Sequence, residues 1–202
     1  MVSGRNITDL AWHIDNNVLT REESLDLFRM AELGWLSLGI SSRIEVEHLD
    51  AKTEAKKTEL ANRRLQFVTS FAPYYLGHSI FESSVLGSDE DGVRLKRVHT
   101  ALWPEADFDE DRVQWEKRTM GRSRIRDSML VSDAIRYCAS AFVTRDLGIL
   151  AASESIRNSF DGFDVMSINS AMRLARSRIA KSRRSGLLRP TNPLTQDLPS
   201  WP

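Results

Sequence analysis

The chain has 202 residues, of which 41% are hydrophobic, and its 28 basic residues balance 28 acidic ones. This length and composition predict one folded domain with a sizeable core and exclude gross disorder. A neutral chain also lacks the global field that attracts a nucleic acid or a membrane, so any such partner must meet a local patch.

The cysteine and histidine content limits the compartment and the metal chemistry. The single cysteine excludes an internal disulfide, and Met1 is followed by polar residues rather than by the apolar core of a signal peptide. No apolar stretch approaches the ~20 residues that span a bilayer, so we expect a soluble cytoplasmic protein with no membrane partner. Four scattered histidines and one cysteine offer no zinc spacing, so a metal ion would be held by oxygen.

The first third of the chain predicts a strand, a helix and a second strand. The apolar run 10–14 predicts a strand that ends at Asp15, and apolar residues at helical spacing predict a helix over 21–33. Gly34 ends that helix, and the short apolar segment 35–41 predicts the second strand. This succession is typical of an α/β fold with a parallel sheet.

The middle of the chain is expected to be mainly helical. Few helix breakers interrupt residues 41–73, whose charged stretch AKTEAKKTELANRRLQF predicts a solvated helix. Residues 86–92 predict a surface loop, 93–103 an amphipathic helix ended by Pro104, and 104–111 an acidic link.

The last third returns to alternating helices and strands. One helical stripe is predicted to contain Asp127, Leu130, Val131, Ala134, Ile135 and Cys138. An apolar strand follows and ends in Thr144, Arg145 and Asp146. We then expect a helix over 147–158, a strand over 163–168, a helix from about residue 170 and an extended Pro-rich end.

Three acidic residues are expected to meet at one edge of the predicted sheet. Asp15 and Asp146 each end a strand, and Asp127 begins a helix that leads into one of those strands. Ligands bind beyond the carboxyl ends of parallel strands, and clustered carboxylates repel unless a cation neutralises them. The pattern therefore indicates a divalent metal. Oxygen ligands without sulfur favour Mg²⁺ or Mn²⁺, which commonly organise the attack of water on a phosphodiester.

Three segments resemble PIN-domain nucleases. DNNVL (15–19) resembles their opening acid motif, and ISSRIEVEHL (40–49) resembles their glutamate-bearing helix. RDSMLVSDAIRYCASAFVTRDLGIL (126–150) resembles their third-acid helix and the Thr-x-Asp strand end that follows it. Departures are Trp12 and His13 within the first strand and a longer gap before the third acid than compact toxin members have.

The resemblance implies a three-layer PIN-like fold, in which helices flank a twisted parallel β-sheet. The implied nuclease domain spans 1–168 and includes an enlarged helical segment over 48–111. Residues 169–202 would form a C-terminal basic helix and an extended tail.

The same resemblance implies a metal site and a reaction. The implied metal ligands, which are also the implied catalytic residues, are Asp15, Glu47, Asp127 and Asp146. Asn17 and Thr144 would support the site by hydrogen bonds. The implied activity is hydrolysis of RNA by a metal-activated water, either in the toxin of a toxin–antitoxin pair or in RNA processing. The implied partners are RNA, an antitoxin protein and a second copy of the chain.

Each of these acids also has a purely structural explanation. Asp15 could form an Asx turn, Asp127 could stabilise the first turn of its helix, and Asp146 could cap the helix after it. Glu45 lies about 200° around the helix from Glu47, so only one of the two can face the site, and Glu45 stays open as the alternative.

Other polar residues are expected to have lesser roles. Asp133 lies outside the apolar stripe and is predicted to be a surface acid near Arg136. Cys138 is predicted to be a small core residue, and no histidine or serine has the spacing of a catalytic pair, so the expected nucleophile is water.

Two basic runs could contact phosphates. Arg122, Arg124 and Arg126 lead into Asp127 and are expected to contact RNA. The run over 173–189 contains no acid and could equally be a solvated helix face.

Two rival classes follow from the same residues. A non-catalytic PIN-fold module would bind RNA or a protein without using metal. A receiver domain or phosphatase would need a lysine beside a strand-end acid, and the sequence offers no such lysine.

Overall fold

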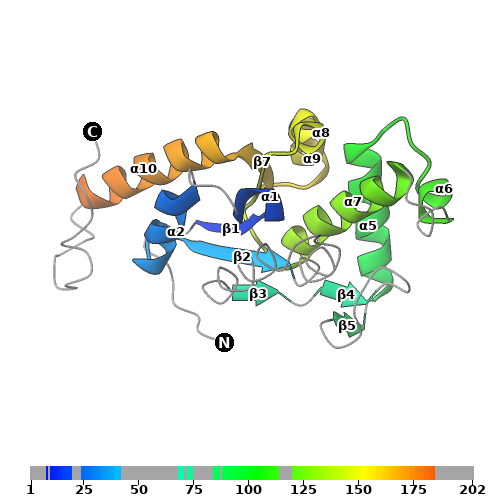
Figure 1. Cartoon of the computed structure of the whole chain (residues 1–202), viewed down its shortest axis with the longest axis horizontal. Coiled ribbons are helices and arrows are strands. Elements are labelled where there is room, and N and C mark those ends of the chain that lie inside the picture. The colour runs from blue at the N-terminus through cyan, green and yellow to red at the C-terminus, as the bar shows by residue number, and fades with distance from the viewer. Residues whose placement is uncertain are drawn as a thin grey trace, which may run out of the picture.

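A five-stranded parallel sheet forms the centre of the molecule in the computed structural model, which describes residues 8, 10–19, 24–41, 68–70, 72–74, 84–86, 88–113 and 120–184. The strand order is β3-β2-β1-β6-β7, and every pairing in it is parallel (Figure 1). The strands are β1 (Ala11–Ile14), β2 (Ser37–Ser41), β3 (Val68–Ser70), β6 (Ala141–Thr144) and β7 (Asp164–Ser167). A separate parallel pair joins β4 (Ala72–Tyr74) to β5 (Ser84–Leu86).

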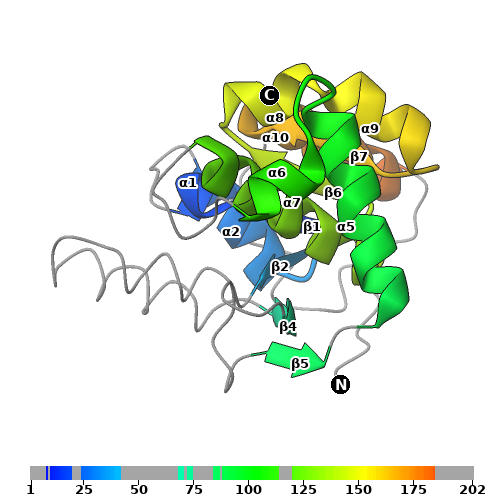
Figure 2. The ribbon, with the colours of Figure 1, turned by 90° about the vertical axis from the view of Figure 1, so that its right-hand side faces the viewer.

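Helices cover both faces of this sheet, which gives three layers. The described helices are α1 (Asn16–Leu19), α2 (Leu25–Glu32), α5 (Asp89–Leu102), α6 (Phe108–Val113), α7 (Met120–Arg136), α8 (Leu147–Ala151), α9 (Ser153–Ser159) and α10 (Ile168–Arg184). α2 and α10 pack on one face, and α5, α7 and α9 pack on the other (Figures 1 and 2).

Alternation along the strands produces the two apolar layers. Ala141 and Val143 face the layer of α2 and α10, whereas Phe142 between them faces α5 and α7. Trp12 and Ile14 of β1 are almost fully buried in the first layer. Burying such side chains stabilises the fold by roughly 1.5–3 kcal/mol each.

The predicted alternation of strands and helices is confirmed at both ends of the chain. The strands expected over 10–14, 35–41 and 163–168 correspond to β1, β2 and β7. Gly34 ends α2 with φ +74°, where its N–H bonds to the carbonyl of Ala31. The helix predicted over 147–158 is two helices, α8 and α9, which meet at Ala152.

Two predictions for the middle of the chain are wrong. Most of the helix expected over 41–73 lies outside the described residues, but its expected end consists of strands, because 72–74 form β4 and 68–70 form β3, which pairs with β2. Its residues Val68 and Thr69 are β-branched and favour strands. The loop expected over 86–92 is largely the first turn of α5, where Ser88 and Asp91 form a capping box.

The C-terminal helix belongs to the central core. Its residues Ala171, Met172, Ala175 and Ile179 are buried in the same cluster as β1 and β2. α10 therefore packs against the sheet on the same face as α2. Among the described residues, no helix is both long and apolar enough to cross a membrane.

Candidate active site

A row of polar residues marks the carboxyl edge of the sheet. The strand register pairs Ser70 of β3 with Ser41 of β2, and Thr144 of β6 with Ser167 of β7. Continuing the register of β1 by one or two residues places Asp15 level with both Ser41 and Thr144. The register thus places Ser41, Asp15, Thr144 and Ser167 level with one another at the ends of four neighbouring strands. Such edges are where parallel α/β proteins bind ligands.

Asp15 lies at the centre of this edge, where Thr144 and Asn17 donate hydrogen bonds to it. Its side chain is only 7% exposed. Its Oδ2 accepts a hydrogen bond from Thr144 Oγ1 at 2.6 Å and another from Asn17 Nδ2 at 2.8 Å. The Oδ1 of Asn17 in turn accepts from the backbone N–H of Arg145 at 3.1 Å. The structure therefore joins Asn17 and Thr144 to Asp15 by hydrogen bonds.

Asp146 is joined to the same group through Thr144. Its backbone N–H donates to Thr144 Oγ1 at 3.0 Å, so one hydroxyl links the ends of β1 and β6. Asp146 is also the N-cap of α8, because its Oδ1 accepts from the N–H of Ile149 at 3.0 Å. A metal ion could be bound only through its other oxygen.

The other predicted ligands do not complete this group. Asp127 lies half-buried on α7, while Glu47 and its alternative Glu45 lie outside the described residues. No three histidine, cysteine, aspartate or glutamate side chains are grouped to hold a metal ion anywhere in the described part of the chain. The structure thus brings Asp15 and Asp146 to one edge, but it does not gather both of them with Asp127 into a ligand set.

Asp133 is a further acid near this edge, and its predicted surface position is wrong. Its side chain is only 1% exposed, and its Oδ2 accepts a 2.7 Å hydrogen bond from Ser41 Oγ at the end of β2. The prediction failed because it assumed one buried stripe on α7. Residues 128–134 are all buried, since α5, α6 and the sheet surround that helix.

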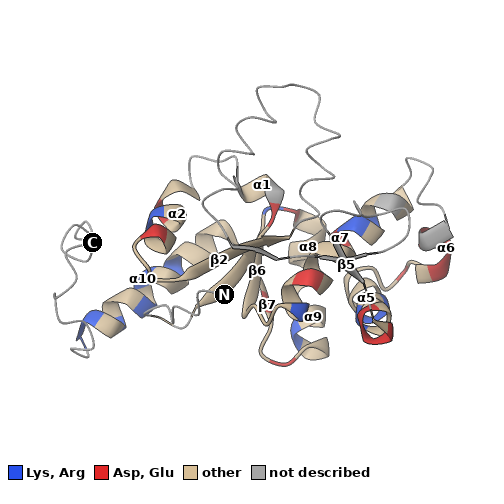
Figure 3. Ribbon diagram, turned by 90° about the horizontal axis from the view of Figure 1, so that it is seen from below, with Lys and Arg blue, Asp and Glu red and all other residues tan. Residues whose placement is uncertain are grey.

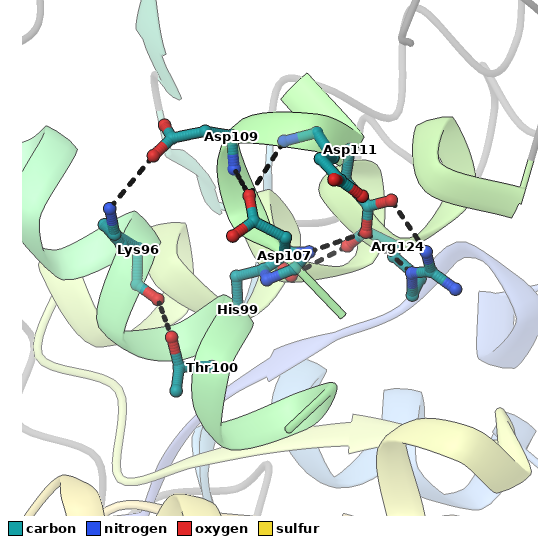
Figure 4. Close-up of polar contacts among 9 residues, drawn as sticks. Lys96, His99, Thr100, Asp107, Asp109, Asp111 and Arg124 are labelled. Atoms are coloured by element: carbon teal, nitrogen blue, oxygen red, sulfur yellow. Dashed lines mark hydrogen bonds and ion pairs between the residues drawn. The ribbon is translucent and has the colours of Figure 1, made fainter. Parts of the chain in front are cut away.

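Helices α5 and α6 hold the N-terminal half of α7 through a buried network of polar side chains (Figure 4). Asp111 of α6 accepts from Arg124 Nε at 2.7 Å and from Nη2 at 2.6 Å. Nε2 of His99 lies 3.0 Å from the same carboxylate, and His99 is fully buried. Asp107 caps α6 by accepting from the N–H groups of Asp109 and Glu110 at 2.8 and 2.9 Å.

Opposite charge and burial set the protonation of this network. The hydrogen bond from Arg124 holds the pKa of Asp111 below its usual value, against the effect of burial. Burial lowers the pKa of His99, and this effect exceeds the opposing contribution of Asp111. The network is therefore an ion pair beside a neutral imidazole at neutral pH.

A second buried carboxylate holds the other end of α7. Asp91 of α5 pairs with Arg136 at 3.3 Å and also contacts Arg94, whose Nε donates to Ser132 at 3.2 Å. Burial raises the pKa of Asp91, but the Ser88 N–H and the two guanidinium groups outweigh it, so the pKa is lowered. The helix that carries Asp127 is thus fixed near both ends.

This network affects the predicted RNA contacts. The guanidinium of Arg124 is already engaged with Asp111 inside the fold, so it is not a free phosphate ligand. Arg126 is half-buried, and the side chain of Arg122 lies outside the described residues. The sequence could not reveal this, because the partner of Arg124 comes from a separate helix.

The opposite edge of the sheet contains a shallow hollow. It has a volume of about 700 Å³ and is lined by residues that include Cys138, Ser140 and Asp161, near the amino ends of β6 and β7. Cys138 is exposed there with φ 55°, beyond the end of α7, so its predicted core position is wrong. The hollow is separate from the acid-bearing edge.

No protein-family model matches the chain, and no curated protein or solved structure is significantly similar to it. The site geometry therefore carries the functional argument.

Proposed function

We propose that the chain is a metal-dependent ribonuclease of the PIN type. The observation that carries the proposal is the sharing of Thr144 between Asp15 and Asp146 at the carboxyl edge. This hydroxyl joins the carboxylate of Asp15 to the backbone of Asp146, so both acids belong to one edge of the sheet, and carboxylate oxygens are ligands that divalent cations prefer. Hydrogen bonds from Asn17 and Thr144 orient the carboxylate of Asp15.

The donor chemistry of this edge suits Mg²⁺ or Mn²⁺. Asp15 and Asp146 would provide carboxylate oxygens, with Asp127 and Glu47 as the further expected ligands. Bound there, the ion would lower the pKa of a water and stabilise charge on the phosphate. The chain itself fixes the carboxylate of Asp15 through Thr144 and Asn17, and that of Asp146 through the N–H of Ile149. The proposed partners are RNA as substrate and, if the chain is a toxin, an antitoxin protein.

The test measures cleavage of a labelled RNA of mixed sequence by the purified full chain with Mn²⁺, Mg²⁺ or EDTA. We expect cleavage only with a divalent ion, and a loss of about 100-fold or more in Asp15→Asn and Asp146→Asn. Asp164→Asn is the matched control, because Asp164 begins β7 at the opposite edge and pairs there with Arg157. Cleavage that survives both edge substitutions contradicts the proposal.

The nucleophile can be tested with the same RNA. A metal-activated water needs no 2′-hydroxyl, so RNA that is 2′-O-methylated at every position should still be cut. Failure to cut that RNA, with normal cutting of the unmodified one, would indicate attack by the 2′-hydroxyl instead.

A non-catalytic RNA- or protein-binding module is the second candidate. The lack of a three-residue metal group within the described residues favours it. Calorimetric titration with Mn²⁺ separates the two candidates. Metal uptake that Asp15→Asn abolishes supports the nuclease, whereas the binding module should show no uptake that depends on Asp15.

A further inference from the structure

We propose that the exposed face of α10 is a binding surface for the RNA phosphate backbone. This inference rests on the proposed function. The helix carries six cations and no acid in 17 residues, although the whole chain is neutral. These cations are Arg173, Arg176, Arg178, Lys181, Arg183 and Arg184. Figure 3 shows α10 with basic residues along its length.

The cations lie on the side of α10 that faces away from the sheet and on the two flanks of that side. At 100° per residue, Arg173 and Arg184 lie opposite the buried face, with the other cations on its two flanks. All six side chains are exposed. Within the described residues, no ion pair involves Arg173, Arg178 or Lys181, so these charges are free to meet an anion.

Helix stability does not account for this pattern. Lys181, Arg183 and Arg184 lie in the last turn, where cations favourably meet the helix dipole. Arg173 and Arg178 lie before that turn and gain little from the dipole, which acts within the terminal turn. Their presence points to an external anionic partner.

The chemistry of the helix favours a polyanion over a lipid surface. A helix that lies in a membrane interface needs an exposed apolar face. The apolar face of α10 is already buried against the sheet through Ala171, Ala175 and Ile179. Only the charged side remains for a partner.

The position of α10 connects this surface to the candidate active site. Ser167, which precedes the helix, pairs with Thr144 at the carboxyl edge. From there the 17-residue helix extends about 25 Å at ~1.5 Å per residue. A single-stranded RNA that is bound at the acids could therefore continue along α10, and this continuity favours RNA over an acidic protein.

The experiment measures binding of a fluorescein-labelled single-stranded RNA by anisotropy in EDTA, which prevents metal-dependent cleavage. The full chain is compared with a triple variant, Arg173→Gln, Arg178→Gln and Lys181→Gln, at several NaCl concentrations. Removing three phosphate contacts should lower the slope of log K against log salt by about 2 and weaken binding about tenfold or more. Glutamine is a good helix former, so the fold should persist, as far-UV circular dichroism would verify.

A matched control removes three exposed cations elsewhere: Arg29→Gln, Lys96→Gln and Arg157→Gln. It should retain the salt slope, and a variant with Arg173→Lys and Arg178→Lys should also retain it. The inference is overturned if the α10 triple variant binds RNA as the unchanged chain does, or if the control loses as much. Polyglutamate serves as a probe for an acidic protein partner. The inference is also overturned if polyglutamate binds through the three substituted cations of α10 while RNA binding does not depend on them.

The result is independent of the cleavage test. Normal Mn²⁺-dependent cleavage with no effect of the α10 substitutions on RNA binding overturns the surface and leaves the nuclease intact. RNA binding through α10 without any cleavage supports the surface and rejects the nuclease.

Discussion

Thr144 is the residue on which the geometry of the candidate site most depends. Its hydroxyl donates to Asp15 and accepts from the backbone N–H of Asp146, and it lies 3.4 Å from Asn17 Nδ2. The side chain is fully buried, so no water can replace these contacts. Deleting the hydroxyl would leave the buried carboxylate of Asp15 and the N–H of Asp146 with one partner fewer.

We therefore expect Thr144→Val to destabilise the fold by roughly 1.5–3 kcal/mol, the usual cost of losing a hydrogen bond to a charged group. Thr144→Ser retains the hydroxyl and should lose much less. Urea unfolding monitored by circular dichroism measures both. Equal stability of Thr144→Val and the unchanged chain would show that the hydroxyl contributes nothing to the edge.

At the level of single residues, the sequence locates residues of the candidate site only where a strand ends. Asp15 directly follows an apolar run and Asp146 follows one by two residues, so both are predicted to lie at a sheet edge. Asp133 was placed wrongly, because a helical pattern shows one apolar stripe and does not show that a helix is covered on several sides. The hydrogen bond from Ser41 to Asp133 joins segments 92 positions apart, which no local pattern encodes.

Among the elements, α7 is held by two ion pairs that flank Asp127. Gly121, in its first turn, lies against Asp111, and a Cβ there would come within 2.5 Å of Asp111 Oδ1 and 3.2 Å of its Cα. A side chain at this position must displace α6 or the ion pair with Arg124. The close approach of α6 and α7 therefore requires glycine.

Gly121→Ala is expected to lower the free energy of unfolding by about 1–3 kcal/mol, because it overpacks this contact. Gly92→Ala is the matched control. It lies in α5 with open space around the added methyl, so it should stabilise the fold by up to about 1 kcal/mol through helix propensity. Urea midpoints of the two variants should move in opposite directions, and a shift of both in the same direction would contradict the packing argument.

The elements themselves were predictable to different degrees. β1, β2, β6 and β7 are short apolar runs bounded by polar residues, and this pattern predicts them as strands. β3 has three residues and follows a charged stretch, and only its pairing with β2 makes it a strand. The start of α5 could have been read from Ser88 and Asp91, whose spacing is that of a capping box.

Over the whole molecule, buried imidazoles link stability to pH. His99 is fully buried, and its Nδ1 has no hydrogen-bond partner among the described residues. A proton on Nδ1 would be buried without an acceptor, which agrees with the lowered pKa of His99. Burial likewise lowers the pKa of His13 to about 4. Both groups are neutral in the folded chain at pH 7 and become charged more readily on unfolding.

The sign of the pH effect follows from this difference. A histidine whose pKa is lower in the folded state than its unfolded value of 6.5 leaves the unfolded chain with more bound protons. The contribution of the neutral histidines to the free energy of unfolding is therefore fully present above pH 6.5, and it decreases as the pH falls below that value. Asp91 and Asp111 have pKa values lowered from 3.8, so their contributions are lost only under more acidic conditions.

His99→Gln tests this linkage, because the glutamine amide can still donate to Asp111 but does not titrate. Between pH 7.5 and pH 5, we expect the unchanged chain to lose more stability than the variant, since only the unchanged chain must keep residue 99 unprotonated. His13 is present in both proteins and cancels from the comparison. Urea unfolding at the two pH values provides the four free energies. Parallel losses in the two proteins would show that His99 is not a source of the acid sensitivity, and a larger loss in the variant would reverse the assigned direction of its pKa shift.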